Sequence, residues 1–238
     1  MAADSKVIIS GFSDEGPTDK RAESQMTMLS ALGMSYYSIR FVDVGNGVKN
    51  VMDLTRTELR RLRSLHNDFG MNVSSIGSPI GKVKLLDVED GTKNAYIPFE
   101  KYLKNSVRRV VDLASVLETR LIRGFSFYHP RGEAPEQFLD RAAERLYAIC
   151  EECRKGDVCF GVEVEANLIG QSGNLLGSLY RKVNHPNLYL IFDGGNLTSQ
   201  NFNVYTSTLN GVNYSQDDDE EKTYFRAIID IANRVQQN

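Results

Sequence analysis

The stretch RLRSLHNDFGMNVSSIGSP, residues 61–79, contains the joint from which we predict the fold of this chain. A pattern of helical period ends immediately before Gly70, and the run Asn72–Gly77 that follows predicts a buried strand. A glycine just past a helix takes up the left-handed conformation that ends the helix. The same joint recurs at Gly33 and Gly156, each after a predicted helix and before a predicted strand. We therefore expect one helix–glycine–strand unit to repeat along the chain.

Short apolar runs alternate with longer segments of helical period, which is typical of a parallel α/β fold. The predicted strands are Val7–Gly11, Tyr36–Phe41, Asn72–Gly77, Arg120–Phe125, Cys159–Glu165 and Leu188–Phe192, with a candidate seventh strand at Val204–Leu209. The predicted helices are Thr18–Leu32, a helix from Asp53 or Thr55 to Phe69, Phe99–Leu117, Pro135–Lys155 and Lys222–Val235.

The composition excludes several classes of protein. The 238 residues are 41% hydrophobic and 25% charged, with a formal net charge of -3, which is ordinary for a single globular domain over residues 1–238. No run approaches the ~20 apolar residues that span a bilayer, and the first residues, MAADSK, lack the features of a secretory signal. No basic excess points to nucleic acid. We expect a cytoplasmic protein with no membrane and no nucleic-acid partner.

Three cysteines have a spacing that resembles part of a zinc site: Cys150, Cys153 and Cys159. Two of them fall inside a predicted helix and the third begins a predicted strand, with no fourth ligand nearby. Free cysteine in such positions behaves as a small hydrophobic residue. We therefore predict that the three thiols are structural.

Two parallel α/β architectures are consistent with this alternation of strands and helices. A doubly wound nucleotide-binding sheet would carry G-x-G-x-x-G after its first strand, and that motif is missing here. A TIM barrel places polar residues at the carboxyl ends of many strands, because its active site is built there. Such residues lie at or just after the carboxyl end of every predicted strand up to the sixth: Ser13, Asp14, Glu15, Arg40, Ser78, Lys82, Arg123, Ser126, Glu163, Glu165, Asp193 and Asn196.

We therefore predict a TIM-type parallel (β/α) barrel. A complete barrel usually needs ~250 residues, and six units already extend to about Asn196. The remaining residues do not contain two full βα units. We expect the barrel to be incomplete, or closed in an unusual way, at its C-terminal end.

Carboxylates at the fifth and sixth strand ends are the strongest candidates for chemistry. In GVEVEANLIG, residues 161–170, Glu163 and Glu165 lie on one face of a strand because side chains alternate with period two. Asp193 ends the next strand in the same way. Such carboxylates can hold a hard divalent cation. Alternatively, a glutamate pairs with an inward Arg40 or Arg123 as a structural ion pair, and the sequence leaves both interpretations open.

Several motifs together resemble a known family. They are GFSDE (11–15), YYSIR (36–40) with KNVMDL (49–54), GSPIGK (77–82), IRGFSFY (122–128) and FDGGN (192–196). In this order they are similar to the sugar phosphate isomerase/epimerase group of xylose isomerase-like TIM barrels. The resemblance covers about Val7 to Gln200 and leaves residues 201–238 as a divergent segment.

The resemblance implies a divalent metal, Mn, Mg, Co or Zn, held by Glu163 and Asp193, with Glu163 and Glu165 as the catalytic carboxylates. The family usually shows Glu-Asn-Glu where this chain has Glu163-Val-Glu165. A later histidine and a glutamate of the last strand complete the family's metal site, and neither has a counterpart here, since no histidine follows Asp193. The expected substrate-binding residues are Glu15, Arg40, Lys82, Ser126, His129 and Asn196.

These residues lead to three functional hypotheses. The first is a metal-dependent sugar or sugar-phosphate isomerase or epimerase, in which carboxylates transfer the proton of the carbon next to a carbonyl group. The second is a degenerate barrel that binds a sugar-like ligand or a partner without turnover, as the two missing ligands suggest. The third, a repair nuclease of the related endonuclease barrels, needs several metal-binding histidines and a basic face, which are lacking. The expected partner is a small carbohydrate, and a homo-oligomer is compatible with the sequence.

Overall fold

The computed structural model describes residues 8–194 and residue 196. Its strands are β1 Tyr36–Ile39, β2 Phe41–Asp43, β3 Val48–Asn50, β4 Asn72–Gly77, β5 Leu121–Gly124, β6 Cys159–Glu163 and β7 Leu188–Ile191. Its α-helices are α1 Ala22–Ala31, α2 Arg56–Phe69, α3 Phe99–Tyr102, α4 Arg108–Val116, α5 Leu139–Lys155 and α6 Gly173–Val183. Short 3-10 turns occur at Ser13–Glu15, Val51–Asp53 and Pro135–Phe138, and a π-helical turn, η3, spans Leu103–Val107.

The central sheet is parallel, with the strand order β1-β4-β5-β6-β7. Strand neighbours in space are therefore neighbours in the chain, apart from the β2–β3 hairpin. A doubly wound sheet reverses its strand order part-way across, whereas this order runs in one direction. The arrangement confirms the predicted barrel-type winding. Among the described residues the sheet is open, with β1 and β7 as its edge strands.

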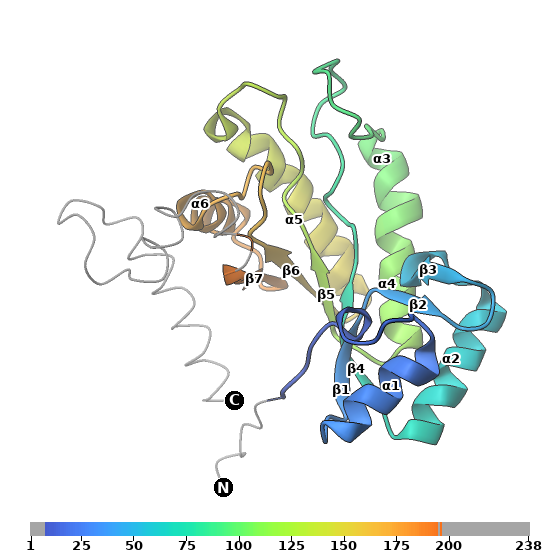
Figure 1. Cartoon of the computed structure of the whole chain (residues 1–238). Coiled ribbons are helices and arrows are strands. Elements are labelled where there is room, and N and C mark those ends of the chain that lie inside the picture. The colour runs from blue at the N-terminus through green and yellow to red at the C-terminus, as the bar shows by residue number, and fades with distance from the viewer. Residues whose placement is uncertain (1–7, 195, 197–238) are drawn as a thin grey trace, which may run out of the picture.

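The helices form a layer on the outside of this sheet. Figure 1 shows α2, α4, α5 and α6 following one another in chain order beside the strands. Neighbouring helices contact each other, α1 with α2, α4 with α5 and α5 with α6. Right-handed crossovers in a sheet wound in one direction put every helix on the same face. The apolar core lies between the helices and the sheet, where Ile39, Ile76, Ile122, Phe160 and Val162 are fully buried.

Most of the predicted elements are confirmed, and α2 illustrates the local reason. Thr55 caps its N-terminus by accepting a hydrogen bond from the backbone of Glu58, and the Glu58 side chain accepts one from the backbone of Thr55. The sequence signature of this reciprocal capping box is the pattern Thr-x-x-Glu at residues 55–58. At the other end Gly70 has φ +64, the predicted left-handed conformation. Strand β4 has the predicted bounds.

The prediction for Gly156 is wrong. Gly33 and Gly70 are left-handed, with φ of +72 and +64, but Gly156 has φ -95 and the left-handed residue is Asp157, with φ +55. Glycine is needed at 156 for another reason. A β-carbon there would lie 2.3 Å from a γ-carbon of Val111, so α5 could not end as close to α4.

The predicted strand Val7–Gly11 does not form in its described part, residues 8–11, and the neighbouring Phe12 makes a single parallel bridge to Ser38 of β1. Ile8 and Ile9 are 52% and 75% exposed. None of the described strands pairs with residues 8–11, and regular hydrogen bonding between strands does not extend along them.

Two further differences concern elements that the sequence did not predict. The strand expected at Tyr36–Phe41 divides into β1 and β2, and β2 turns back as a hairpin through Gly45 and Gly47 to pair with β3. Helix α6 was not predicted.

The candidate strand Val204–Leu209 and the helix Lys222–Val235 lie outside the described residues.

The cysteines are structural, as predicted. Cys150 and Cys153 are fully buried on α5, and Cys159 is half-buried at the start of β6. Burial raises the pKa of the Cys150 and Cys153 thiols. No helix in the described part of the chain is long and apolar enough to cross a membrane.

Candidate active site

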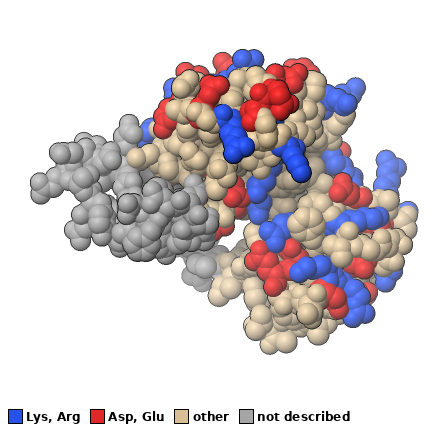
Figure 2. Space-filling view, turned by 45° about the horizontal axis from the view of Figure 1, so that its top comes forward, with Lys and Arg blue, Asp and Glu red and all other residues tan. Residues whose placement is uncertain are grey.

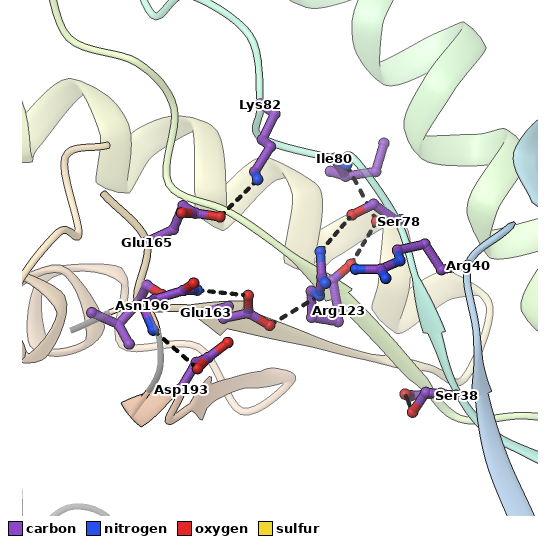
Figure 3. Close-up of polar contacts among 12 residues, drawn as sticks. Ser38, Arg40, Ser78, Ile80, Lys82, Arg123, Glu163, Glu165, Asp193 and Asn196 are labelled. Atoms are coloured by element: carbon purple, nitrogen blue, oxygen red, sulfur yellow. Dashed lines mark hydrogen bonds and ion pairs between the residues drawn. The ribbon is translucent and has the colours of Figure 1, made fainter. Parts of the chain in front are cut away.

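A cavity of about 360 Å³ opens where the strands of the parallel sheet end. This volume is within the range of cavities that hold small molecules. Figure 3 shows that its polar side chains come from strand ends that are far apart in the chain. The lining residues are Phe12, Glu15, Arg40, Phe41, Asn50, Gly77, Ser78, Pro79, Lys82, Arg123, Phe125, Glu163, Glu165, Asp193 and Asn196. We call this cavity the mouth.

Arg123 lies on β5 between two glycines of the neighbouring strands. It is in register with Gly77 of β4 and with Gly161 of β6. A β-carbon at Gly77 would lie 2.5 Å from a ring carbon of Phe12, and one at Gly161 would lie 2.6 Å from a δ-carbon of Ile191. The glycines thus let these neighbours pack against the sheet on both sides of Arg123, which anchors the guanidinium in the interior.

Arg123 and Glu163 form a buried ion pair at the base of the mouth. Nε of Arg123 lies 3.0 Å from Oε2 of Glu163, and the two residues are 7% and 5% exposed. Burial lowers the pKa of the Arg123 guanidinium, and the charge of Glu163 acts against that change. Burial likewise raises the pKa of the Glu163 carboxyl, and Arg123 opposes the rise. Glu163 therefore accepts a proton more readily than an exposed glutamate.

A second ion pair joins Lys82 to Glu165 at the rim. Lys82 Nζ donates a hydrogen bond to Glu165 Oε2 over 2.7 Å, as Figure 3 shows. The same ammonium lies 4.2 Å from the centre of the Phe125 ring. Both glutamates that the sequence placed on one face therefore reach the mouth, and each faces a cation.

Arg40, the residue after β1, is held by the loop that precedes α1. Its Nε and Nη2 donate to Oδ2 of Asp14 over 3.1 and 2.9 Å, and Nη2 also lies 2.9 Å from Oε1 of Glu15. The guanidinium lies 4.6 Å from the centre of the Phe12 ring. A fork-shaped donor is well suited to two carboxylates at once.

Asn196 links the two carboxylates that the sequence proposed as metal ligands. Its Nδ2 donates to Oε1 of Glu163 over 3.2 Å and to the carbonyl of Val164 over 3.0 Å. Its backbone N–H donates to Oδ1 of Asp193 over 3.2 Å. Glu163 and Asp193 therefore lie on the same wall of the mouth (Figure 3). The charge of Asp193 adds to the rise in the pKa of Glu163.

The sequence profile of the xylose isomerase-like TIM barrel family matches residues 27–234 of this chain. The chain belongs to this family. The family predicted from the motifs is thereby confirmed, and so is the barrel fold class. No curated protein matches the chain at a significant level.

Several solved structures are similar in fold to this chain. D-psicose 3-epimerase, solved in the presence of D-fructose, has a TM-score of 0.59 and 13% identity, over 81% of this chain and 66% of that one. L-ribulose 3-epimerase has a TM-score of 0.57 and 16% identity, over 82% and 63%. A xylose isomerase-like TIM barrel protein from Mycobacterium smegmatis, in complex with magnesium, has a TM-score of 0.56 and 18% identity, over 80% and 65%. The chain thus spans somewhat less than two thirds of the length of these proteins.

The residues described for this xylose isomerase-like chain do not form a metal site by themselves. They contain no group of three or more histidine, cysteine, aspartate or glutamate residues that could hold a metal ion. Both oxygens of Glu163 already face protein donors, Oε2 facing Arg123 and Oε1 facing Asn196. A metal on Glu163 and Asp193 would have to displace these contacts and would need further ligands.

Two of the predicted substrate-binding residues lie outside the mouth. The Ser126 hydroxyl is fully buried and accepts a hydrogen bond from the backbone N–H of Gly170 over 2.7 Å. His129 lies against its neighbour Pro130, with Nδ1 3.0 Å from the Pro130 carbonyl, and its ring stacks on Phe138. The structure brings the other predicted site residues together: Glu15, Arg40, Lys82, Glu163, Glu165, Asp193 and Asn196.

Sequence reasoning did not select the aromatic wall of the mouth. Phe12 and Phe125 lie against the basic side chains, and Arg123 is 4.9 and 4.6 Å from the centres of their rings. Both belong to the motifs quoted for the family, GFSDE and IRGFSFY. Each of these phenylalanines stands next to polar residues at the end of a predicted strand, and this position in the sequence could have identified them as lining residues.

Proposed function

We propose that this protein is an isomerase or epimerase of a small carbohydrate, with the mouth as its active site. The observation that carries the proposal is Glu163, a buried carboxylate with a raised pKa at the end of a barrel strand. A general base is most effective when its pKa approaches the working pH. The likeness in fold to two sugar 3-epimerases supports the same class of reaction.

In this proposal Glu163 takes the proton from the carbon next to the substrate carbonyl. Negative charge then develops on the carbonyl oxygen, where cationic donors of the mouth, Arg123 and Lys82, stabilise it. Return of a proton to the same carbon from the other side gives an epimer. Its delivery to the former carbonyl carbon, with the hydroxyl proton passing from one oxygen to the other, gives an isomer. Glu165 is the second carboxylate available for the return step. The reaction conserves all atoms and needs no oxidant.

The divalent metal predicted from the sequence belongs to this proposal only with added ligands. Within the described part of the chain, Glu163 and Asp193 are the carboxylates that would contribute to it. The remaining ligands would be water, oxygens of the substrate, or further side chains from residues 197–238 or a second copy of the chain.

A second candidate function is a barrel that binds a sugar-like ligand without turnover. The ion pairs favour it, because Arg123 and Lys82 each already face one of the two proposed catalytic carboxylates. A carboxylate held in this way is less free to move a proton.

Replacement of Glu163 by glutamine tests the two candidates. The amide keeps the shape of the side chain and removes the base, so we expect isomerisation or epimerisation of free ketoses to fall by a factor of at least about 100. Binding of the ketose, measured by calorimetry, should persist.

Glu152→Gln is the matched control, because Glu152 pairs with Arg108 and Lys155 on the surface of α5. It should retain full activity. Full activity of the Glu163 variant would assign the base to another group. Ketose binding by the unaltered protein, with no turnover in the presence or absence of added Mn or Mg, would favour the second candidate.

A further inference from the structure

Each basic side chain that lines the mouth, within the described residues, already has a carboxylate partner. The three are Arg40, Lys82 and Arg123. Their ion pairs have nitrogen–oxygen distances of 2.7 to 3.0 Å. A cation held by its own carboxylate offers less attraction to an incoming anion than a free one does.

Aromatic rings hold the same cations from another side. The Lys82 ammonium and the Arg123 guanidinium lie 4.2 and 4.6 Å from the centre of the Phe125 ring. Arg40 lies 4.6 Å from the centre of the Phe12 ring. Contacts of this kind stabilise a cation in place. Turning a basic group toward a phosphate would therefore break a ring contact as well as an ion pair.

The mouth carries more acidic than basic groups. Its lining includes four carboxylates, Glu15, Glu163, Glu165 and Asp193, against three cations. Figure 2 shows acidic and basic side chains side by side where this face of the molecule is hollowed. Asp14, which holds Arg40 from behind, adds a further carboxylate.

The C-terminal segment, taken as a whole, brings no net positive charge. Residues 197–238 contain three basic residues and six acidic ones. The segment as a whole therefore has a net charge of -3.

An anionic substrate group and a hydroxyl group would meet this lining differently. A phosphate or carboxylate would be repelled by the paired protein carboxylates, and to replace one of them on its cation would leave that carboxylate unpaired, in part in a buried place, which is strongly unfavourable. A hydroxyl both donates and accepts hydrogen bonds. It can therefore donate to a carboxylate and accept from a cation of the same pair without separating them.

We propose that the substrate is an uncharged, multiply hydroxylated carbohydrate, and that the paired charges of the mouth exclude sugar phosphates and sugar acids. This inference rests on the proposed function, since it names the substrate class of the same site.

Calorimetry on the full chain tests the inference with free and phosphorylated probes. The free probes are D-fructose, D-psicose and L-ribulose, and the anionic probes are D-fructose 6-phosphate and inorganic phosphate. We expect at least one free ketose to bind, and D-fructose 6-phosphate to bind at least about tenfold more weakly than that ketose, because its charge is opposed.

The variant Glu165→Gln releases Lys82 from its partner while keeping the shape of the side chain. The ratio of affinities should then shift by about tenfold toward the phosphorylated sugar. Glu152→Gln makes the same change on the surface of α5, away from the mouth, where it releases Arg108 and Lys155. It should leave the ratio unchanged.

The possible outcomes separate the inference from the proposed function. Tighter binding of the phosphorylated sugar by the unaltered chain overturns the inference and leaves a carbohydrate enzyme in place. An unchanged ratio in the Glu165 variant also overturns it, because the pairing of Lys82 would not then exclude the phosphate. No binding of any sugar overturns both.

Discussion

Tyr37 and His66 are a pair of buried polar side chains away from the mouth, on β1 and α2. The Tyr37 hydroxyl and Nε2 of His66 lie 2.6 Å apart and form a hydrogen bond, and the two rings meet edge to face. Burial lowers the pKa of His66 to about 4. Burial raises the pKa of Tyr37, so both groups stay neutral at ordinary pH. The pair thus links α2 to the sheet without a charge.

The low pKa of His66 predicts a loss of stability in acid. Its pKa is about 6.5 in the unfolded chain and about 4 when folded, so between these values the unfolded state binds more protons. The free energy of unfolding should therefore fall by about 3 kcal/mol as the pH falls from 6.5 to 4. Urea denaturation at a series of pH values measures this. His66→Gln, which does not titrate, should lose that part of the pH dependence, and an unaltered slope in the variant would contradict the assignment.

At the scale of elements, the long helix before β5 changes its winding where it supports the mouth. Helix α3 continues through the π-helical turn η3 into α4. Such turns inside α-helices are often found near functional sites. Tyr102, directly before the turn, accepts a hydrogen bond from the backbone N–H of Gly81 over 2.8 Å. Gly81 has φ +91, and a β-carbon there would lie 2.0 Å from the Phe125 carbonyl oxygen. The helix thus holds the residue before Lys82.

Tyr102→Phe should weaken both the fold and the mouth. It leaves the buried N–H of Gly81 without its acceptor, which costs about 1–3 kcal/mol of unfolding free energy. Lys82 would lose its fixed position, so ketose affinity should fall as well. Chemical denaturation and calorimetry measure the two effects. Tyr147→Phe, on an exposed part of α5, should change stability by less than about 0.5 kcal/mol. Unchanged values for the Tyr102 variant would show that the hydrogen bond does not support the mouth.

At the scale of the whole molecule, the described sheet leaves two edges, β1 and β7. Unpaired edges expose backbone groups that proteins normally cover. The predicted helix Lys222–Val235, which lies outside the described residues, carries apolar residues at helical spacing. They are Phe225, Ile228, Ile229, Ile231, Ala232 and Val235. We propose that this face packs onto the barrel and covers part of the opening.

Removal of the residues after Gln216 tests this packing. The truncated chain should expose apolar surface and aggregate, or unfold at a lower temperature, because that surface would then face water. Size-exclusion chromatography and thermal denaturation measure both effects. A matched full-length variant with aspartate at Ile228 and Ile231 should show the same loss. A truncated protein that stays monomeric and equally stable would make the C-terminal segment an appendage.

The sequence by itself determined what depends on neighbours along the chain. The capping box of α2, the bounds of β4 and the left-handed Gly70 follow from residues within one or two turns. Helix α6 was not predicted from the sequence. It contains the weak helix formers Gly173 and Gly177 and owes its stability to burial against α5 and β7.

The tertiary structure decided which partners the site residues have. Glu163, Glu165 and Asp193 could be placed at strand ends from the sequence, because the alternation of side chains along a strand and the order of the strands depend only on neighbouring stretches of the chain. It left open whether Glu163 would face a metal or an arginine, and the register of β5 against β6 brings Arg123 beside it. Register depends on contacts between strands that lie far apart in the chain. A shift of one residue would turn every side chain of a strand to the other face.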